Sequence, residues 1–267
     1  MRQGKGRCVT DSVLLQDLSS GVLTLTLNRA DKMNALSRAM VDALRAALID
    51  SMSNNEVRII VIKGAGRAFC AGADLKERAT MSEAETRAFV AKLRDSMNLI
   101  YSHPKITLAH ITGFALGGGL EMALACDLRY AVKGVKVGLT ETGLGIIPGA
   151  GGTQLLPRIA GVSAAKRLIF KAKPILAEEA QQLGIVDVCD EADALAETLQ
   201  ADADAMAANA PLALQAAKMA INNGAELGLQ QGLAIERLCY DRIIPTEDRL
   251  EGLRAFKEKR KPKYQGR

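Results

Sequence analysis

The chain has 267 residues, of which 48% are hydrophobic and 24% are charged, and its net charge at pH 7 is +5. This composition predicts a globular protein with a sizeable core, built as one large domain or as one domain with an appendage. It contains no apolar run of membrane-spanning length, and its modest positive charge suits phosphorylated cofactors as well as nucleic acid. The basic residues 1–8 lack a following apolar stretch, which excludes a secretory signal and leaves a transit-peptide remnant or a frayed end.

The number and spacing of the cysteines and histidines limit the kinds of site and mechanism that the protein could have. The five cysteines are scattered and lack CxxC spacing, which favours a reducing compartment and argues against a disulfide framework or a zinc site. Only two histidines, His103 and His110, are available as bases. If the protein is an enzyme, we therefore expect carboxylates to move its protons, and we expect no metal site.

The predicted elements alternate strands with helices and then become mostly helical. Residues 13–18 and 22–27 predict a β-hairpin, since the second run alternates apolar residues with threonine. Apolar, β-branched runs predict further strands at 57–62, 105–111, 127–132, 135–139 and 185–189. Apolar stripes predict helices at 37–52, 81–101, 163–170, 177–183, 193–209, 211–223, 227–243 and 247–257. Because only helices follow the last strand, we place a boundary at Pro211, between a core of residues 1–210 and a helical region of residues 211–267.

Three glycine-rich connections follow apolar strands, at residues 63–76, 117–119 and 140–153. Their recurrence predicts that the strand ends converge on a site lined by backbone atoms. The second connection joins the apolar run 114–116 to the helix-forming residues 120–125, which indicates a strand, a bare turn and a buried helix. Glycine lets a ligand approach the backbone, and the first N–H groups of a helix attract negative charge.

Polar side chains near these turns are the chemical candidates. Glu121, in the first helical turn, either complements the helix dipole or serves catalysis, and Glu141 is either a solvated loop residue or a second acid. Asp74 and Lys76 form either a surface pair or part of an anion-binding turn, and Cys70 is expected to pack rather than to react. Two backbone donors from separate turns and two glutamates are the machinery for enolate chemistry on a carbonyl, without a metal or a redox cofactor.

Three motifs resemble those of the enoyl-CoA hydratase (crotonase) superfamily, and the likeness extends from about Val13 to Tyr264. They are FCAGADL at 69–75, GFALGGGLEMALACD at 113–127 and IPGAGGTQ at 147–154. The resemblance implies an α/β fold, a spiral of β-β-α turns followed by a helical trimerisation region. It also implies an acyl-CoA thioester as substrate, coenzyme A as part of that substrate rather than a cofactor, and a trimer or a dimer of trimers.

Residue by residue, the resemblance implies that the N–H groups of Ala73 and Gly118 form an oxyanion hole and that Glu121 and Glu141 are the catalytic acids. It implies that Gly149 lines the water site through its backbone. Ala73, Asp74, Leu75 and Lys76 would lie along the CoA moiety, and Ala71 and Gly117 would also bind the substrate. Two glutamates favour a hydratase of α,β-unsaturated acyl-CoA, with an isomerase or a CoA-ester decarboxylase on the same scaffold as alternatives.

Residues 71–79 and 244–260 more narrowly resemble the AU-rich-RNA-binding methylglutaconyl-CoA hydratases and their mitochondrial paralogues. This implies a role in fatty-acid or leucine breakdown, in the cytoplasm of a bacterium or in the mitochondrial matrix of a eukaryote. In that group, RNA binding depends on lysines of the first long helix. The matching positions here are Arg38, Asp42 and Ala46, and this mixture of charges argues against RNA binding. The basic tail after Phe256 is either solvated or in contact with CoA phosphates.

Overall fold

A six-stranded sheet forms the centre of the molecule, in the order β1-β2-β3-β5-β7-β10. The structure is a computed structural model that describes residues 12–267, so the prediction for residues 1–8 lies outside the described residues. The strands of this sheet are β1 (Leu14–Ser19), β2 (Val22–Leu27), β3 (Ile59–Gly64), β5 (Ile106–Ile111), β7 (Leu128–Val132) and β10 (Val188–Asp190). β1 and β2 form the predicted antiparallel hairpin, and the other neighbours in the sheet are parallel.

A second, smaller sheet has the order β4-β6-β8-β9. Its strands are β4 (Ala68–Cys70), β6 (Phe114–Leu116), β8 (Lys136–Gly138) and β9 (Ile175–Leu176). The chain visits the large sheet, the small sheet and then a helix three times in succession, as β3-β4-α3, β5-β6-α4 and β7-β8-α5. These repeated β-β-α turns form the crotonase spiral that the sequence predicted.

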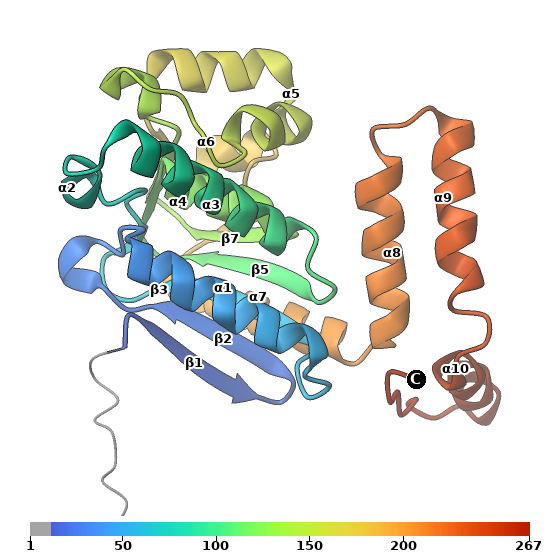
Figure 1. The fold of residues 1–267 in the computed structure, drawn as a ribbon. Coiled ribbons are helices and arrows are strands. Elements are labelled where there is room, and N and C mark those ends of the chain that lie inside the picture. The colour runs from blue at the N-terminus through green and yellow to red at the C-terminus, as the bar shows by residue number, and fades with distance from the viewer. Residues whose placement is uncertain (1–11) are drawn as a thin grey trace, which may run out of the picture.

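The helices cover the sheets and then extend to one side of them (Figure 1). In chain order they are η2 (Ala30–Lys32), α1 (Arg38–Ser53), α2 (Leu75–Arg78), α3 (Glu83–Tyr101), α4 (Gly118–Ala125), η3 (Glu141–Leu144), α5 (Gly152–Lys171), α6 (Ala177–Gln182), α7 (Ala192–Ala207), α8 (Pro211–Gly224), α9 (Leu229–Asp241) and α10 (Glu247–Glu258). Ser82 and Glu85 form a capping box at the start of α3. No helix within residues 12–267 is long and apolar enough to cross a membrane.

The strand β3, in the middle of the large sheet, is buried on both faces. Ile60 and Ile62 belong to the core shared with α1, α3 and α4, whereas Ile59 and Val61 pack with Leu195 and other residues of α7. Successive strand residues point to opposite faces, so an unbroken apolar strand requires helices on both sides. The strand ends are thereby held rigidly where the glycine-rich connections begin.

Two predicted elements begin or end several residues away from their expected positions. The helix expected at 163–170 begins at Gly152, and it includes a break at Gly161, where φ is 79°. Glycine is a poor helix former, so the local sequence did not predict the first turns of this helix, which tertiary contacts stabilise. The strand expected at 185–189 is confined to Val188–Asp190, because Ile185 and Val186 instead pack their side chains into the main core.

Candidate active site

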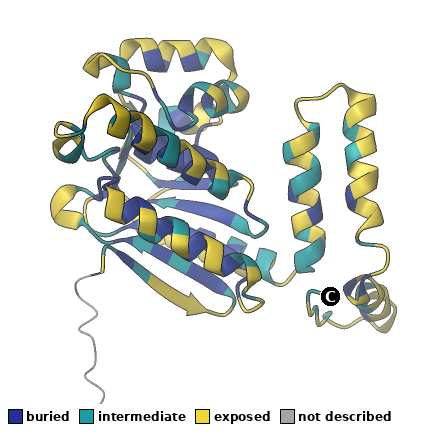
Figure 2. Cartoon of the chain, in the orientation of Figure 1, coloured by how far each residue is buried: buried dark blue, intermediate teal, exposed yellow. Residues whose placement is uncertain are grey.

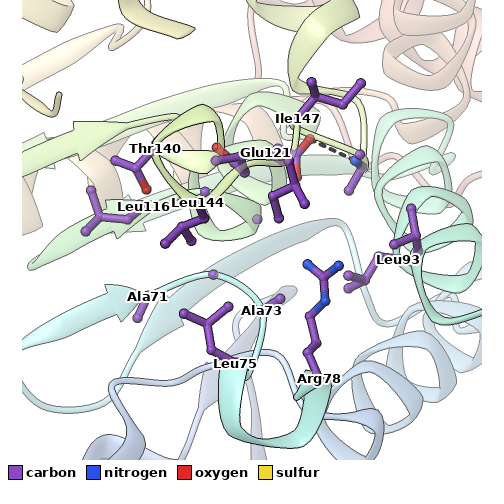
Figure 3. Close-up of a pocket in the computed structure, with 18 residues that line it drawn as sticks. Ala71, Ala73, Leu75, Arg78, Leu93, Leu116, Glu121, Thr140, Leu144 and Ile147 are labelled. Carbon is purple, nitrogen blue, oxygen red and sulfur yellow. Dashed lines mark hydrogen bonds between the residues drawn. The ribbon is translucent and has the colours of Figure 1, made fainter. Parts of the chain in front are cut away.

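A cavity of about 610 Å³ lies where the three glycine-rich connections meet. Figure 3 shows its two facing walls, one from the first connection and α2 and the other from the second and third connections. The lining residues are Ala71, Gly72, Ala73, Leu75, Arg78, Val90, Leu93, Leu116, Gly117, Gly118, Glu121, Thr140, Glu141, Leu144, Ile146, Ile147, Gly149 and Ala150. The predicted convergence of strand ends on one backbone-lined site is confirmed.

Two glycine turns bring the candidate oxyanion donors, Ala73 and Gly118, together. A Cβ atom built on Gly118 would lie 3.7 Å from the Ala73 nitrogen, and one built on Gly72 would lie 3.3 Å from the Gly118 nitrogen. No turn, loop or cap hydrogen bond within residues 12–267 uses the N–H group of Ala73 or Gly118. Both donors line the cavity, so the arrangement suits an oxyanion that accepts from both.

Gly117 is required at this turn for two reasons. Its φ of 52° and ψ of −126° lie in a region that residues with a Cβ atom rarely adopt. In addition, a Cβ atom on Gly117 would lie 3.1 Å from Glu141 Oε1. The missing side chain therefore lets the second carboxylate approach the start of α4.

Glu121 lies in the first turn of α4 and is only 3% exposed. Its Oε1 atom accepts hydrogen bonds from the N–H groups of Ala150 and Gly152, both at 2.8 Å, and the dashed line in Figure 3 marks the bond near Ile147. Its Oε2 atom accepts no hydrogen bond from a residue in the range 12–267. Burial raises the pKa of Glu121, while the N–H groups of Gly152 and Ala150 oppose that rise. A helix-dipole role alone would not require this specific anchoring.

Glu141 is the first residue of η3 and faces the same cavity. Its Oε2 atom is buried and has no hydrogen-bond partner among the described residues. Burial, together with the nearby charge of Glu121, raises the pKa of Glu141 to about 7. A carboxyl group that is half protonated at neutral pH is suited to donate a proton, so the pair can divide acid and base roles.

The other predicted site residues separate into two groups. Ala71, Leu75 and Gly149 line the cavity, as Gly117 does. Asp74 and Lys76 do not line it. The Asp74 carboxylate caps α2 by accepting from the Glu77 N–H and pairs with Arg29 at 3.1 Å, so it is not the partner of Lys76. Direct contact of Asp74 or Lys76 with a substrate stays a prediction.

Several residues of the site were not predicted from the sequence, and four of them have polar groups that bear on its chemistry: Arg78, Thr140, Ala150 and Gly152. Thr140 and Arg78 line the cavity, and the N–H groups of Ala150 and Gly152 hold Glu121. The sequence did offer a signal for Ala150 and Gly152, because both belong to the third glycine-rich motif. Arg78 lies three residues after the first motif, but its direction depends on the short helix α2.

An apolar cavity with two backbone donors and two carboxylates is suited to reactions that pass through an enolate. Residues 17–267 match the family model described as enoyl-CoA hydratase/isomerase. The chain therefore belongs to the enoyl-CoA hydratase/isomerase family.

Curated relatives and solved structures agree with this assignment. The chain is 48% identical to human mitochondrial methylglutaconyl-CoA hydratase, over 94% of this chain and 76% of that protein. It is 44% identical to a putative enoyl-CoA hydratase/isomerase of Bacillus subtilis, over 96% of this chain and 99% of that protein. The crystal structure of an enoyl-CoA hydratase from Bacillus anthracis matches with a TM-score of 0.93 and 44% identity, over 96% of this chain and 100% of that one.

Proposed function

We propose that the protein is an enoyl-CoA hydratase, which adds water reversibly across the double bond of an α,β-unsaturated acyl-CoA thioester. The observation that carries the proposal is the meeting of two carboxylates, Glu121 and Glu141, with two unused backbone donors at one cavity. Methylglutaconyl-CoA is the substrate for which the human relative is named, and it is a candidate substrate here. This would place the enzyme in leucine or fatty-acid breakdown.

In the proposed mechanism, the thioester oxygen accepts hydrogen bonds from the N–H groups of Ala73 and Gly118. Glu121 takes a proton from a water molecule as the water oxygen bonds to the β-carbon. The electron pair of the double bond moves toward the thioester, and the resulting enolate oxygen is stabilised by the two donors. Glu141 then gives its proton to the α-carbon, which completes the addition of one water. The raised pKa of Glu141 supports its role as the acid.

Product analysis tests this function against an isomerase or a decarboxylase on the same scaffold. The purified protein is incubated with crotonyl-CoA in isotopically labelled water. The thioesters are then separated, and their masses are measured by mass spectrometry. We expect a hydroxyacyl-CoA that carries the label. A product of unchanged mass would support an isomerase. In a parallel incubation with a dicarboxylic enoyl-CoA, loss of carbon dioxide without added water would support a decarboxylase.

The C-terminal helices support self-association into a trimer or a dimer of trimers, with a boundary near Pro211. α8 and α9 lie side by side at one side of the main sheets, with α10 next to the C-terminus (Figure 1). Their outer faces are exposed in the single chain (Figure 2). Large apolar side chains on them are more than half exposed, namely Ile221, Leu229, Leu238, Tyr240, Leu250, Leu253 and Phe256. Light scattering of the purified protein would test the assembly by its mass.

RNA binding is not part of the proposal, because the one basic residue at the three matching positions of α1 is already paired with a carboxylate. Arg38 pairs with Glu85, and Asp42 pairs with Lys92. A salt-dependent mobility shift with AU-rich RNA, abolished by reversing the charge of basic residues on α1, would contradict this.

The names of the relatives bear on the cellular compartment. The human relatives carry the word mitochondrial in their names, and another relative is bacterial. We therefore propose the mitochondrial matrix for a eukaryotic source and the cytoplasm for a bacterial one.

A further inference from the structure

The short helix η3, which begins with Glu141, has few contacts that hold it in place. Its backbone hydrogen bonds are local, because the N–H groups within it and just after it donate to carbonyl groups of residues 140–142. Its last residue, Leu144, is 58% exposed. In Figure 3, Thr140 and Leu144 lie on the same wall of the cavity as Glu121. Local bonds of this kind shape the turn but do not fix its position against the rest of the molecule.

One side chain ties η3 to a different element. The Thr142 hydroxyl donates a hydrogen bond to the carbonyl oxygen of Ile169, in the last turn of α5. The carbonyl groups of a last helical turn lack a partner within the helix, so this bond satisfies an acceptor that would otherwise be unpaired. No other hydrogen bond among residues 12–267 joins η3 to another helix or strand. A Cβ atom built on Gly143 would lie 3.4 Å from the Cβ atom of Ala172, so η3 rests directly on the end of α5.

The other end of α5 holds the second acid. The N–H group of Gly152, the first residue of α5, donates to Glu121 Oε1 at 2.8 Å. In a straight helix, Gly152 and Ile169 would be about 26 Å apart, at 1.5 Å per residue. The break at Gly161, where φ is 79°, divides α5 into two shorter helices, so both of its ends can reach the site. α5 is therefore the common support of Glu121 and of the turn that carries Glu141.

The charges near Glu141 show why its position matters. Glu121 and Arg78 are the only other charged side chains among the described residues that line the cavity. The charged residues of β8 and of the second half of α5 are exposed, namely Lys136, Lys166, Arg167 and Lys171. Burial, and then the nearby charge of Glu121, raise the pKa of Glu141 to about 7. Both effects depend on where η3 places the carboxyl group, because the interaction of two charges weakens as they separate.

Building on the proposed hydratase function, we propose that Thr142 is a positioning residue of the reaction, whose hydroxyl fixes η3 on α5 and thereby sets the place of Glu141 relative to Glu121. Thr142 is not among the residues that line the cavity, so its effect on catalysis passes through Glu141. A misplacement of about 1 Å in a reacting group can lower a rate about 100-fold.

The test compares Thr142→Val, which keeps the shape of the side chain without its hydroxyl, with Thr142→Ser, which keeps the hydroxyl. For hydration of crotonyl-CoA, kcat, KM and the pH profile of kcat/KM are measured. We expect Thr142→Val to lower kcat by about 10- to 100-fold with little change in KM. The fall of kcat/KM at high pH should begin at a lower pH, because a carboxyl group that is less buried and farther from Glu121 loses its proton more readily. Thr142→Ser should restore both properties.

Two further variants separate positioning from general stability. In the matched control, Thr246→Val, the lost hydroxyl bond is the one to the Ile243 carbonyl at 2.8 Å, before α10. This variant should be less stable but should keep the pH profile of the wild type. Thr142→Ala also removes the Thr142 hydroxyl, but it leaves room for water to reach the Ile169 carbonyl. It should therefore fold even where Thr142→Val does not, and it should show the same shift in the pH profile.

The pKa of Glu141 is also measured without turnover, by nuclear magnetic resonance of isotopically labelled glutamate carboxyl groups. The signal of Glu141 is identified by its absence from Glu141→Gln. We expect the pKa of Glu141 to be lower in Thr142→Val than in the wild type and in Thr142→Ser.

Three results would overturn the inference. An unchanged kcat and pH profile in Thr142→Val and Thr142→Ala would show that the bond to α5 does not position Glu141. An equal shift in Thr246→Val would assign the effect to stability, and a rise in KM alone would assign Thr142 to substrate binding. If the wild type hydrates no enoyl-CoA, the hydratase function is removed, and the titration of Glu141 still decides the positioning role by itself.

Discussion

Glu121 offers a test in which catalysis and stability respond in different ways to two substitutions. Its Oε1 atom accepts two N–H groups at 2.8 Å, and the side chain is 3% exposed. Glu121→Gln keeps an oxygen that can accept both bonds but removes the base. Glu121→Ala removes the base and leaves the N–H groups of Ala150 and Gly152 buried without an acceptor.

The two variants should therefore differ in the free energy of unfolding. Leaving a buried donor unpaired costs about 1–3 kcal/mol, so Glu121→Ala should be about 2–6 kcal/mol less stable than Glu121→Gln. Burial raises the pKa of Glu121, so between its ordinary pKa and the raised value the folded state binds more protons than the unfolded state. Stability falls as pH rises through that window, and Glu121→Gln, which carries no charge, should be at least as stable as the wild type at pH 8.

Turnover should fall by about 100- to 10,000-fold in both variants, as expected when a general base is lost. Urea unfolding gives the stabilities, and the loss of absorbance of the enoyl thioester gives the rates. Equal stability of Glu121→Ala and Glu121→Gln would refute the anchoring role of the two N–H groups. Near-normal turnover of Glu121→Gln would refute the assignment of the base.

Three further substitutions test the rest of the site. Because Glu141 must be protonated to act as an acid and its pKa is about 7, kcat/KM for hydration should fall above about pH 7, and the residual activity of Glu141→Gln should lack this limb of its pH profile. Gly118→Ala should fold, since alanine is the better helix former. Its Cβ atom would lie 3.7 Å from the Ala73 nitrogen, beside the two donors, and should lower kcat by about 100- to 1000-fold. Normal turnover would argue against the oxyanion hole. Asp74→Ala should remove the α2 cap and the partner of Arg29, which should lower the free energy of unfolding by about 1–2 kcal/mol. It should raise KM more than it changes kcat. An unaltered unfolding curve would contradict the capping role.

Local patterns were sufficient to predict most elements of this fold. The alternation in residues 22–27 determines a half-buried strand, and Ser82 with Glu85 determines the start of α3, because each signal acts within a few residues. The strand, glycine turn and buried helix around Gly118 were predictable for the same reason. β4 and β9 were missed because strands of three and two residues are too short to show a period.

The sequence by itself determined the spiral architecture, through its motifs, and the residue types available for the chemistry. Only the tertiary structure decided how those residues are used. The bond from Ala150 to Glu121 spans 29 residues along the chain, and no local pattern specifies which acceptor a distant N–H group will find. The pKa of Glu141 depends on burial and on the charge of Glu121, both of which arise only when the connections pack together. The direction of Arg78 likewise follows from how α2 is tied down, which is a property of the folded chain.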